Sequence, residues 1–292
     1  MLLLMIVVLP FLGLVLPLLA GHGRRALCTL LAALAPLVAL ALLLTLADAT
    51  LSGLVLQAGF EWLPGLGLNP GLRLDGLGLL FSLLILGIGL LVILYAHYYL
   101  GEDEPVGRFY AFLLLFMGAM LGLVLSANLL QMLVFWELTS LSSFLLIGFW
   151  GHRSDARRGA RMALAVTGGG GLALLAGILL IGQVVGSFDL ATVLAAGDLI
   201  RAHALYPLIL VLVLLGVFTK SAQFPFHFWL PHAMAAPTPV SAYLHSATMV
   251  KAGVFLLARL YPALSGTDLW FYLVSFTGLT TLLFGAVMAL FQ

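Results

Sequence analysis

The sequence predicts an all-α membrane protein with about nine transmembrane helices. Hydrophobic residues make up 63% of its 292 residues and charged residues only 8%, and the mean hydropathy is +1.21. About a quarter of the residues of an ordinary soluble domain are charged, so this composition lies far outside the soluble range. A bilayer-spanning helix needs about 20 mainly apolar residues, and such stretches follow one another along nearly the whole chain.

The apolar stretches are separated by short segments rich in glycine, proline or charge. The first stretch lacks a basic leading region and is followed by Arg24 and Arg25, so we interpret it as a membrane helix and not as a signal peptide. The expected spans are residues 2–20, 26–46, 76–97, 109–127, 129–150, 162–185, 206–232, 240–261 and 269–290.

Two connections are long enough to have structure of their own. Residues 47–75 contain several turn-forming residues, which predict a structured external loop or a short hairpin: Pro64, Gly65, Gly67, Pro70 and Gly71. Residues 187–203 are only half apolar, so they are too polar to cross the bilayer and suit a short helix at the outer interface.

Arginine is unevenly distributed between alternate connections, and this asymmetry predicts the orientation. One side carries only Arg73, Arg201 and, near a helix end, Arg259. The richer side is expected to be cytoplasmic, which places the N-terminus outside; its arginines are Arg24, Arg25, Arg108, Arg153, Arg157, Arg158 and Arg161.

The remaining composition argues against several functional classes. The 12 basic and 11 acidic residues nearly cancel, so no basic surface is expected for nucleic acid. His227 and His232 are five residues apart with no Cys, Asp or Glu beside them, which is a poor metal signature, and we expect no metal and no cofactor. The run Gly168–Gly171 lacks the Gly-Lys-Ser/Thr of a phosphate-binding loop and instead predicts close approach of a neighbouring helix.

An acidic residue lies within the fifth expected span. Glu137 shares much of one helix face with Ser140 and Ser143, because residues three and six positions apart lie on the same side. A charge inside the bilayer costs about 2.5–3.5 kcal/mol even on translocon scales. We therefore expect this polar stripe to face away from lipid and Glu137 to be functional.

The seventh expected span contains a lysine and should be broken. Pro225 cannot donate the hydrogen bond that the carbonyl of Ser221 would accept in a helix. Free backbone groups at membrane depth are tolerated only where protein or water satisfies them, and in transporters they mark ion sites. Lys220, five residues before the proline, is therefore a candidate ion-site residue.

The eighth expected span carries His245 and Lys251, which are six residues or about 9 Å apart along a helix. That spacing excludes a direct hydrogen bond, although water or the hydroxyls of Ser246 and Thr248 could connect them. Histidine titrates near neutral pH, and a lysine removed from water has a lowered pKa. Both residues are therefore candidates for proton exchange. The alternative for His245 is a buried histidine with a local partner.

Three long motifs carry a family resemblance: Phe-Trp-Glu-Leu-Thr-Ser-Leu-Ser-Ser around Glu137, Phe-Thr-Lys-Ser-Ala-Gln-Phe-Pro around Lys220, and Ala-Pro-Thr-Pro-Val-Ser-Ala-Tyr-Leu-His-Ser-Ala-Thr-Met-Val-Lys-Ala-Gly through Lys251. They resemble the antiporter-like membrane subunits shared by respiratory NADH:quinone oxidoreductases and Mrp-type multisubunit sodium/proton antiporters. With Glu-Trp-Leu-Pro near residue 61, the chain looks most like the N-terminal part of the large A-type subunit of the Mrp antiporter.

The resemblance implies a fold and an activity. Residues 1–108 would form three N-terminal helices with an external loop, 109–265 an antiporter-like five-helix repeat with a broken seventh helix, and 266–292 the first helix of a second repeat. Glu137, Lys220, His245 and Lys251 would form a proton relay in which an ionised Glu137 favours the ammonium form of Lys220. The implied partners are other subunits of a hetero-oligomeric antiporter, protons, monovalent cations such as sodium, and lipids of the bacterial cell (inner) membrane.

The chain departs from this family pattern at its end, because it stops at Gln292 just after the ninth expected span. Almost all of the second repeat and its lysine would then be missing, as in a fragment. Two alternatives stay open: a chain-5-type proton-pumping subunit of NADH:quinone oxidoreductase, which would belong to an enzyme and not to a secondary transporter, and a non-transporting truncated membrane module.

Overall fold

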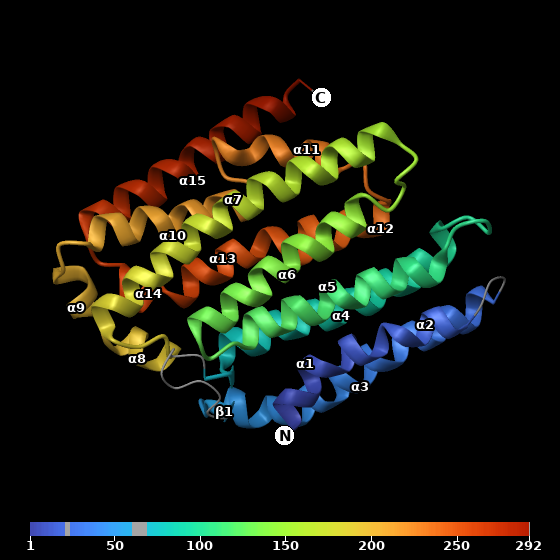
Figure 1. Ribbon diagram of the computed structural model, residues 1–292, viewed down its shortest axis with the longest axis horizontal. Helices are drawn as coiled ribbons and strands as arrows, with labels where there is room; N and C mark the ends of the chain where they lie inside the picture. Colours follow the sequence, from blue (N-terminus) through green and yellow to red (C-terminus); the bar gives the residue numbers. More distant parts are fainter. Residues whose placement is uncertain (21–23, 60–68, 292) are drawn as a thin grey trace.

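A computed structural model describes residues 1–20, 24–59 and 69–291, which form a bundle of long helices with a small hairpin at one end (Figure 1). The elements are α1 (Leu2–Gly13), α2 (Val15–Leu19), α3 (Arg25–Leu51), β1 (Leu56–Gly59), β2 (Gly71–Leu74), α4 (Gly76–Tyr99), α5 (Val106–Leu125), α6 (Leu129–Ile147), α7 (Ser154–Val185), α8 (Leu190–Ala195), α9 (Gly197–Ala202), α10 (Tyr206–Lys220), the 3-10 turn η2 (Phe226–Phe228), α11 (Trp229–Ala233), α12 (Thr238–Ser241), the π-helical turn η3 (Ala242–Ala247), α13 (Met249–Arg259), α14 (Tyr261–Leu264) and α15 (Asp268–Ala289).

The predicted all-α membrane fold is confirmed. Eight helical segments of the described chain are long and apolar enough to cross a membrane, and α10 is a shorter apolar helix. The first span consists of α1 and α2 in succession, and α7 begins at Ser154, eight residues before the predicted start of its span. The apolar pattern begins only after Arg161, but the helix itself starts earlier and includes the charged residues from Asp155 to Arg161.

The long connection after α3 contains the short hairpin that its turn residues predicted. Strands β1 and β2 pair antiparallel, with Leu56 opposite Leu74 and Gly59 opposite Gly71. Residues 60–68 between the strands, which include Pro64, Gly65, Gly67 and the Glu-Trp-Leu-Pro motif, lie outside the described residues.

Helix α5 lies at the centre of the bundle. In the 18-residue apolar stretch of α5, 83% of the residues are buried, which is the largest share of any candidate span in the described chain. It packs against α1, α4 and α6, while α7 packs against α6 and α10. The core is therefore built around apolar residues of α5, and the face of α6 that points away from α5 is shared with α7.

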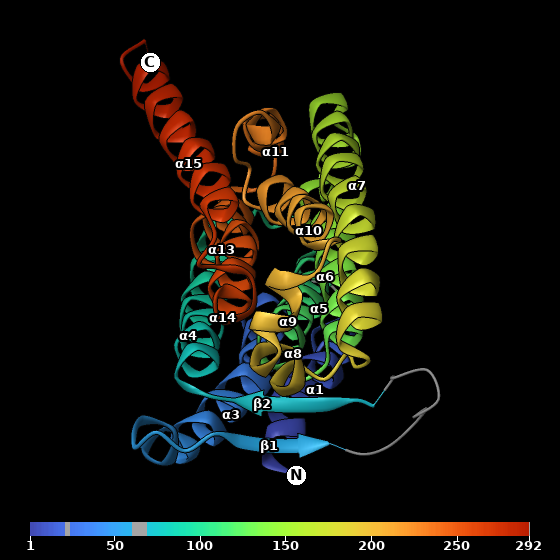
Figure 2. The same ribbon diagram turned by 90° about the vertical axis from the view of Figure 1, so that its left-hand side faces the viewer.

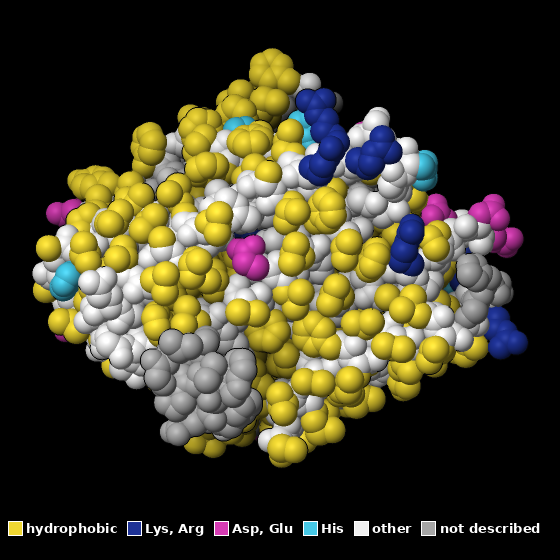
Figure 3. Space-filling view, viewed as in Figure 1, with side chains coloured by type: hydrophobic (Ala, Val, Ile, Leu, Met, Phe, Trp, Pro, Cys, Tyr) yellow, Lys and Arg dark blue, Asp and Glu magenta, His cyan; other side chains and the backbone are white. Residues whose placement is uncertain are grey.

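The two ends of the bundle differ in charge. The hairpin, α8 and α9 lie together at one end (Figure 2), and the connections between α4 and α5 and between α6 and α7 lie at the other (Figure 1). In Figure 3 the Lys and Arg side chains on the visible face gather toward this second end, beside a surface that is otherwise mainly hydrophobic. The two short helices α8 and α9 replace the single interfacial helix expected between residues 187 and 203.

Helix α15 leans away from the rest of the bundle (Figure 2). None of its 18-residue apolar stretch is buried, and residues of its second half contact the segment after α10. Phe224 donates its backbone N–H to Thr281 Oγ1 at 3.0 Å, and the ring of His227 lies 4.5 Å from that of Phe284.

Candidate functional site

Lys220 is the last residue of α10 and its side chain is fully buried, with 0% of its surface exposed. Its Nζ donates to the backbone carbonyl of Trp136 at 3.0 Å and to Ser140 Oγ at 2.8 Å, both on α6. The ammonium also lies 5.1 Å from the centre of the Trp136 ring. A buried ammonium is stable only where acceptors and negative charge compensate its lost hydration, and α6 supplies them.

The helix break after Lys220 follows from the local sequence. Helix α10 ends at Lys220, Ala222 adopts a positive φ of 50°, and the chain resumes helical geometry only in η2 and α11. The carbonyl of Ser221, which Pro225 cannot serve, accepts a hydrogen bond from the Gln223 side chain at 3.1 Å. The predicted broken seventh helix is therefore present, and the glutamine compensates for the missing backbone donor.

Glu137 follows Trp136 on α6 and its carboxylate points toward α7. The residue is half-buried, and its Oε1 is a buried oxygen for which the described residues provide no hydrogen-bond partner. Within the described chain no N–O contact of 4.0 Å or less joins Glu137 to Lys220. Glu137 and the two acceptors of the Lys220 ammonium therefore lie on the same stretch of α6, although the carboxylate and the ammonium form no direct ion pair.

The predicted polar stripe on α6 faces the interior. Ser140 and Ser143 are buried, and Ser140 is the residue that contacts Lys220. Ser143 donates its hydroxyl to the Ser140 carbonyl at 2.8 Å. The stripe thus begins at Glu137 and continues as hydroxyl groups beside the lysine.

Half of the glycine run on α7 allows the close helix approach that was predicted. A side chain at Gly171 would collide with Glu137 Oε1, and one at Gly170 would collide with Thr219 of α10. Gly168 and Gly169 have no neighbouring atom within 4 Å of such a side chain. Gly170 and Gly171 therefore form the wall against which the carboxylate and the end of α10 pack.

His245 lies close to this cluster but separated from it by an indole ring. Its ring centre is 6.0 Å from that of Trp229, whose Nε1 donates to the Thr219 carbonyl at 2.9 Å. Both ring nitrogens of His245 are buried, and neither has a hydrogen-bond partner among the described residues. The local hydrogen-bond partner that was the alternative for this histidine is therefore not found there.

Lys251 is not part of the cluster. The eighth span is interrupted, because Ala242–Ala247 form a π-helical turn and Thr248 has non-helical torsion angles, so the expected regular spacing between His245 and Lys251 does not hold. Lys251 is exposed on the surface of the chain. Its neighbour Val250 contacts the break, however, since its carbonyl accepts the hydroxyl of Ser221 at 2.7 Å.

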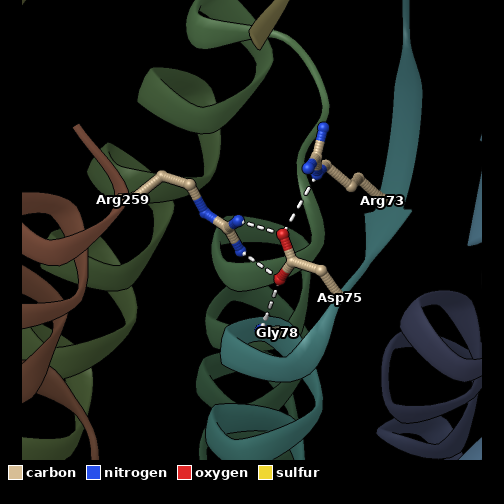
Figure 4. A network of polar contacts seen from close by, with 4 residues as sticks. All are labelled: Arg73, Asp75, Gly78 and Arg259. Carbon is tan, nitrogen blue, oxygen red and sulfur yellow. Dashed lines mark hydrogen bonds and ion pairs between the residues drawn. The ribbon is translucent and has the colours of Figure 1, made fainter. Parts of the chain in front are cut away.

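A second polar network, which the sequence did not reveal, connects the far end of α13 to the start of α4 (Figure 4). Arg259 donates through both terminal nitrogens to Asp75, with Nη2 at 2.9 Å from Oδ1, and Arg73 Nε contacts Oδ2 at 3.1 Å. Asp75 also caps α4 by accepting the N–H of Gly78 at 3.0 Å. Burial alone would raise the pKa of Asp75, but the hydrogen bonds from Arg259 and Gly78 outweigh it and hold the pKa well below its usual range.

His227 and His232 lie apart from the Lys220 cluster. Among the described residues no group of three or more His, Cys, Asp or Glu side chains could hold a metal ion. The ring of His227 stacks against Phe224, and the carbonyl of His232 packs against Gly159. Neither histidine approaches Lys220 through any described contact.

Comparisons with known proteins identify the family and the fold. Residues 126–292 match the family described as NADH:quinone oxidoreductase/Mrp antiporter, TM, and residues 62–110 match NADH-Ubiquinone oxidoreductase (complex I), chain 5 N-terminus. The chain superposes on a chain of the Mrp complex from Dietzia sp. with a TM-score of 0.88 and 38% identity, over 98% of this chain and 31% of that one.

Curated relatives include a probable K(+)/H(+) antiporter A/B-type subunit from Rhizobium meliloti, 65% identical over 82% of this chain and 24% of its own length. The Na(+)/H(+) antiporter A-type subunit of Alkalihalophilus pseudofirmus is 48% identical over 97% of this chain and 35% of its own length. The chain thus spans about a quarter to a third of the length of these relatives. Because the family match covers more than half of its residues, the chain belongs to the family of NADH:quinone oxidoreductase/Mrp antiporter membrane subunits.

Proposed function

We propose that this chain is a proton-translocating part of a multisubunit monovalent cation/proton antiporter, a secondary transporter and not an enzyme. The observation that carries the proposal is Lys220. A lysine that is completely buried in a membrane bundle, at the end of a broken helix, is costly to maintain. Its acceptors and the adjacent Glu137 make it a group that can hold a proton and release it when its surroundings change.

The arrangement supports a short sequence of proton movements. While Glu137 is ionised, its charge together with Ser140 and the Trp136 carbonyl favours the ammonium form of Lys220. A rotation or hydration of the Glu137 carboxylate weakens that support and favours release of the proton. His245, whose ring nitrogens lack partners in the described structure, is the next acceptor, beyond Trp229.

Lys251 is assigned the outgoing end of this relay. It lies on the outer surface of α13, whereas Val250 beside it contacts the break through Ser221. A lysine at that place would pass its proton to groups outside the described bundle, such as another subunit of the complex. The proposed partners are therefore other membrane subunits, together with lipids, protons and a monovalent cation.

The names of the relatives leave the cation as either potassium or sodium. The arginine-rich end of the bundle is proposed to face the cytoplasm of a bacterial cell, which places the N-terminus outside. The second candidate is a proton-pumping chain-5-type subunit of NADH:quinone oxidoreductase, favoured by the match of residues 62–110. Neighbouring genes for six small antiporter subunits or for redox subunits would separate the two.

The proposal is tested with the intact complex in everted membrane vesicles, by measuring the collapse of a proton gradient on addition of Na⁺ or K⁺. Glu137→Gln keeps the shape of the side chain and removes its charge, and we expect it to abolish antiport at normal expression. Glu102→Gln, an exposed loop glutamate, is the matched control and should transport like wild type. Antiport near the wild-type rate in Glu137→Gln vesicles would refute the charge-pair mechanism.

A further inference from the structure

A cavity of about 530 Å³ opens where α5 begins and where α6 gives way to α7. Its apolar wall includes Phe112 of α5 and Phe144 of α6, both half-buried. Its polar side is formed by His152 and by three arginines, Arg108, Arg157 and Arg161. This volume falls in the range of about 300–1,000 Å³ that is usual for small-molecule sites.

Arg108 also lines a neighbouring pocket that contains Glu102, Asp103 and Glu104, but the three arginines together concentrate positive charge at this cavity. None of them has a carboxylate within 4.0 Å among the described residues, and no Asp or Glu lines the cavity. Nearby Arg153, by contrast, pairs with Asp155 at 2.6 Å. An exposed arginine on a protein surface needs no partner, but three around one cavity make a site for an anion.

The hydrogen bonds of these arginines hold the guanidinium groups in place and leave donors free. Arg157 Nη1 donates to the Gly151 carbonyl at 2.8 Å, Arg108 Nη2 to the Phe149 carbonyl at 3.3 Å, and Arg161 Nε to the Arg157 carbonyl at 3.3 Å. Each guanidinium has five N–H donors, so most of them are available to a ligand. The charges are therefore partly pre-positioned.

The position of the cavity restricts the ligand. It lies at the ends of three apolar helices, on the end of the bundle toward which the Lys and Arg side chains of Figure 3 gather, and we expect lipid headgroups at this level of the protein. A small soluble anion would use the arginines but gain nothing from Phe112 and Phe144. We propose that this cavity binds an anionic phospholipid, with its phosphate on the three arginines and the start of one acyl chain along the phenylalanines. Basic pockets of this kind between membrane helices are suited to anionic headgroups.

A general role in membrane orientation would depend on the number of arginines and not on their exact place. Arg158 provides the comparison, because it is exposed on the same helix beside Arg157 but does not line the cavity. Arg157→Gln and Arg158→Gln remove the same charge from the same end of α7. The two variants therefore distinguish specific binding of a lipid in the cavity from general electrostatic attraction of anionic lipids to this end of the bundle.

The test measures phospholipid binding to the purified full chain in detergent by native mass spectrometry, with phosphatidylglycerol, phosphatidylcholine and inorganic phosphate as probes. We expect one phosphatidylglycerol to bind saturably and more tightly than phosphatidylcholine. Arg157→Gln and Arg161→Gln should each weaken that binding about fivefold, from about 1 kcal/mol per charge, and Arg158→Gln should leave it unchanged. Arg161→Lys, which keeps the charge, should retain most of the binding and guards against a folding defect.

Three results would overturn the proposal. Equal losses in Arg157→Gln and Arg158→Gln would show diffuse electrostatic attraction. Equal binding of phosphatidylcholine would remove the need for the arginines. Displacement of the lipid by inorganic phosphate at comparable concentration would show that the apolar wall contributes nothing to binding and that the site takes a free anion.

Discussion

Gly171 offers a way to move the Glu137 carboxylate without changing any charge. A methyl group at this position would collide with Glu137 Oε1 and lie 2.7 Å from its Cδ. Because these atoms form the flexible end of a side chain, Gly171→Ala should rotate the carboxylate and leave the helices in place. An off-rotamer side chain costs about 0.5–1.5 kcal/mol, and alanine is favoured over glycine inside a helix by about 0.5–1 kcal/mol, so the two effects nearly cancel in the free energy of unfolding.

The effect on transport should be larger. The carboxylate and the Lys220 ammonium are more than 4.0 Å apart, and at such distances a further separation of about 2 Å weakens their attraction by at most about 1.4 kcal/mol at an effective dielectric constant of about 20, a factor of at most about ten. We therefore expect Gly171→Ala to lower antiport severalfold, and by at most about tenfold, in vesicles that contain the intact complex. Gly168→Ala, on the same helix with no atom within 4 Å, is the matched control and should transport normally. Equal antiport in the two variants, at equal expression, would refute the importance of the carboxylate position.

Three further variants test other parts of the structure. Lys251→Gln should reduce antiport less than Lys220→Gln, because Lys251 is exposed and apart from the cluster; initial rates in vesicles decide this, and equal losses would count against the order of the relay. Asp75→Asn leaves the buried Arg259 unpaired and should lower the free energy of unfolding by about 3 kcal/mol at pH 7, measured by thermal denaturation in detergent. Since the folded-state pKa of Asp75 lies below its usual value, its stabilisation is complete above about pH 4 and is lost as the pH falls further, so variant and wild type should converge in acid. Gly159→Ala would collide with a backbone carbonyl on α11 and should lower thermal stability by about 1–3 kcal/mol, whereas an unchanged melting temperature would show that α11 moves aside.

Much of the fold could be predicted from the sequence because membrane helices obey a strict length and composition rule. The hairpin in the connection after α3 and the break after Lys220 were also predictable, since glycine and proline act locally. The interruption at Thr248 was not, because nothing in the apolar pattern of residues 240–261 distinguishes a π-helical turn from a regular helix. Without that turn, His245 and Lys251 were expected to lie on one regular helix.

Part of the candidate site was predictable because charged residues are conspicuous in apolar stretches. Glu137 and Lys220 are charges in apolar stretches, so they stand out, and the structure brings both to the same segment of α6. The separation of His245 by Trp229 depends on packing between distant helices, which one sequence does not encode visibly. The pair formed by Asp75 and Arg259 was missed because each residue, taken alone, looks like an ordinary helix-end charge.

The pair formed by Arg259 and Asp75 holds one end of the helix that carries Lys251. The guanidinium of Arg259 holds one end of helix α13 through two hydrogen bonds. At its other end the helix begins after Thr248 and the π-helical turn Ala242–Ala247. A helix anchored at one end and joined to irregular backbone at the other can be displaced most easily at the irregular end. We therefore expect any displacement of α13 to be largest around His245, while the hydrogen bonds between Arg259 and Asp75 hold its other end against the start of α4.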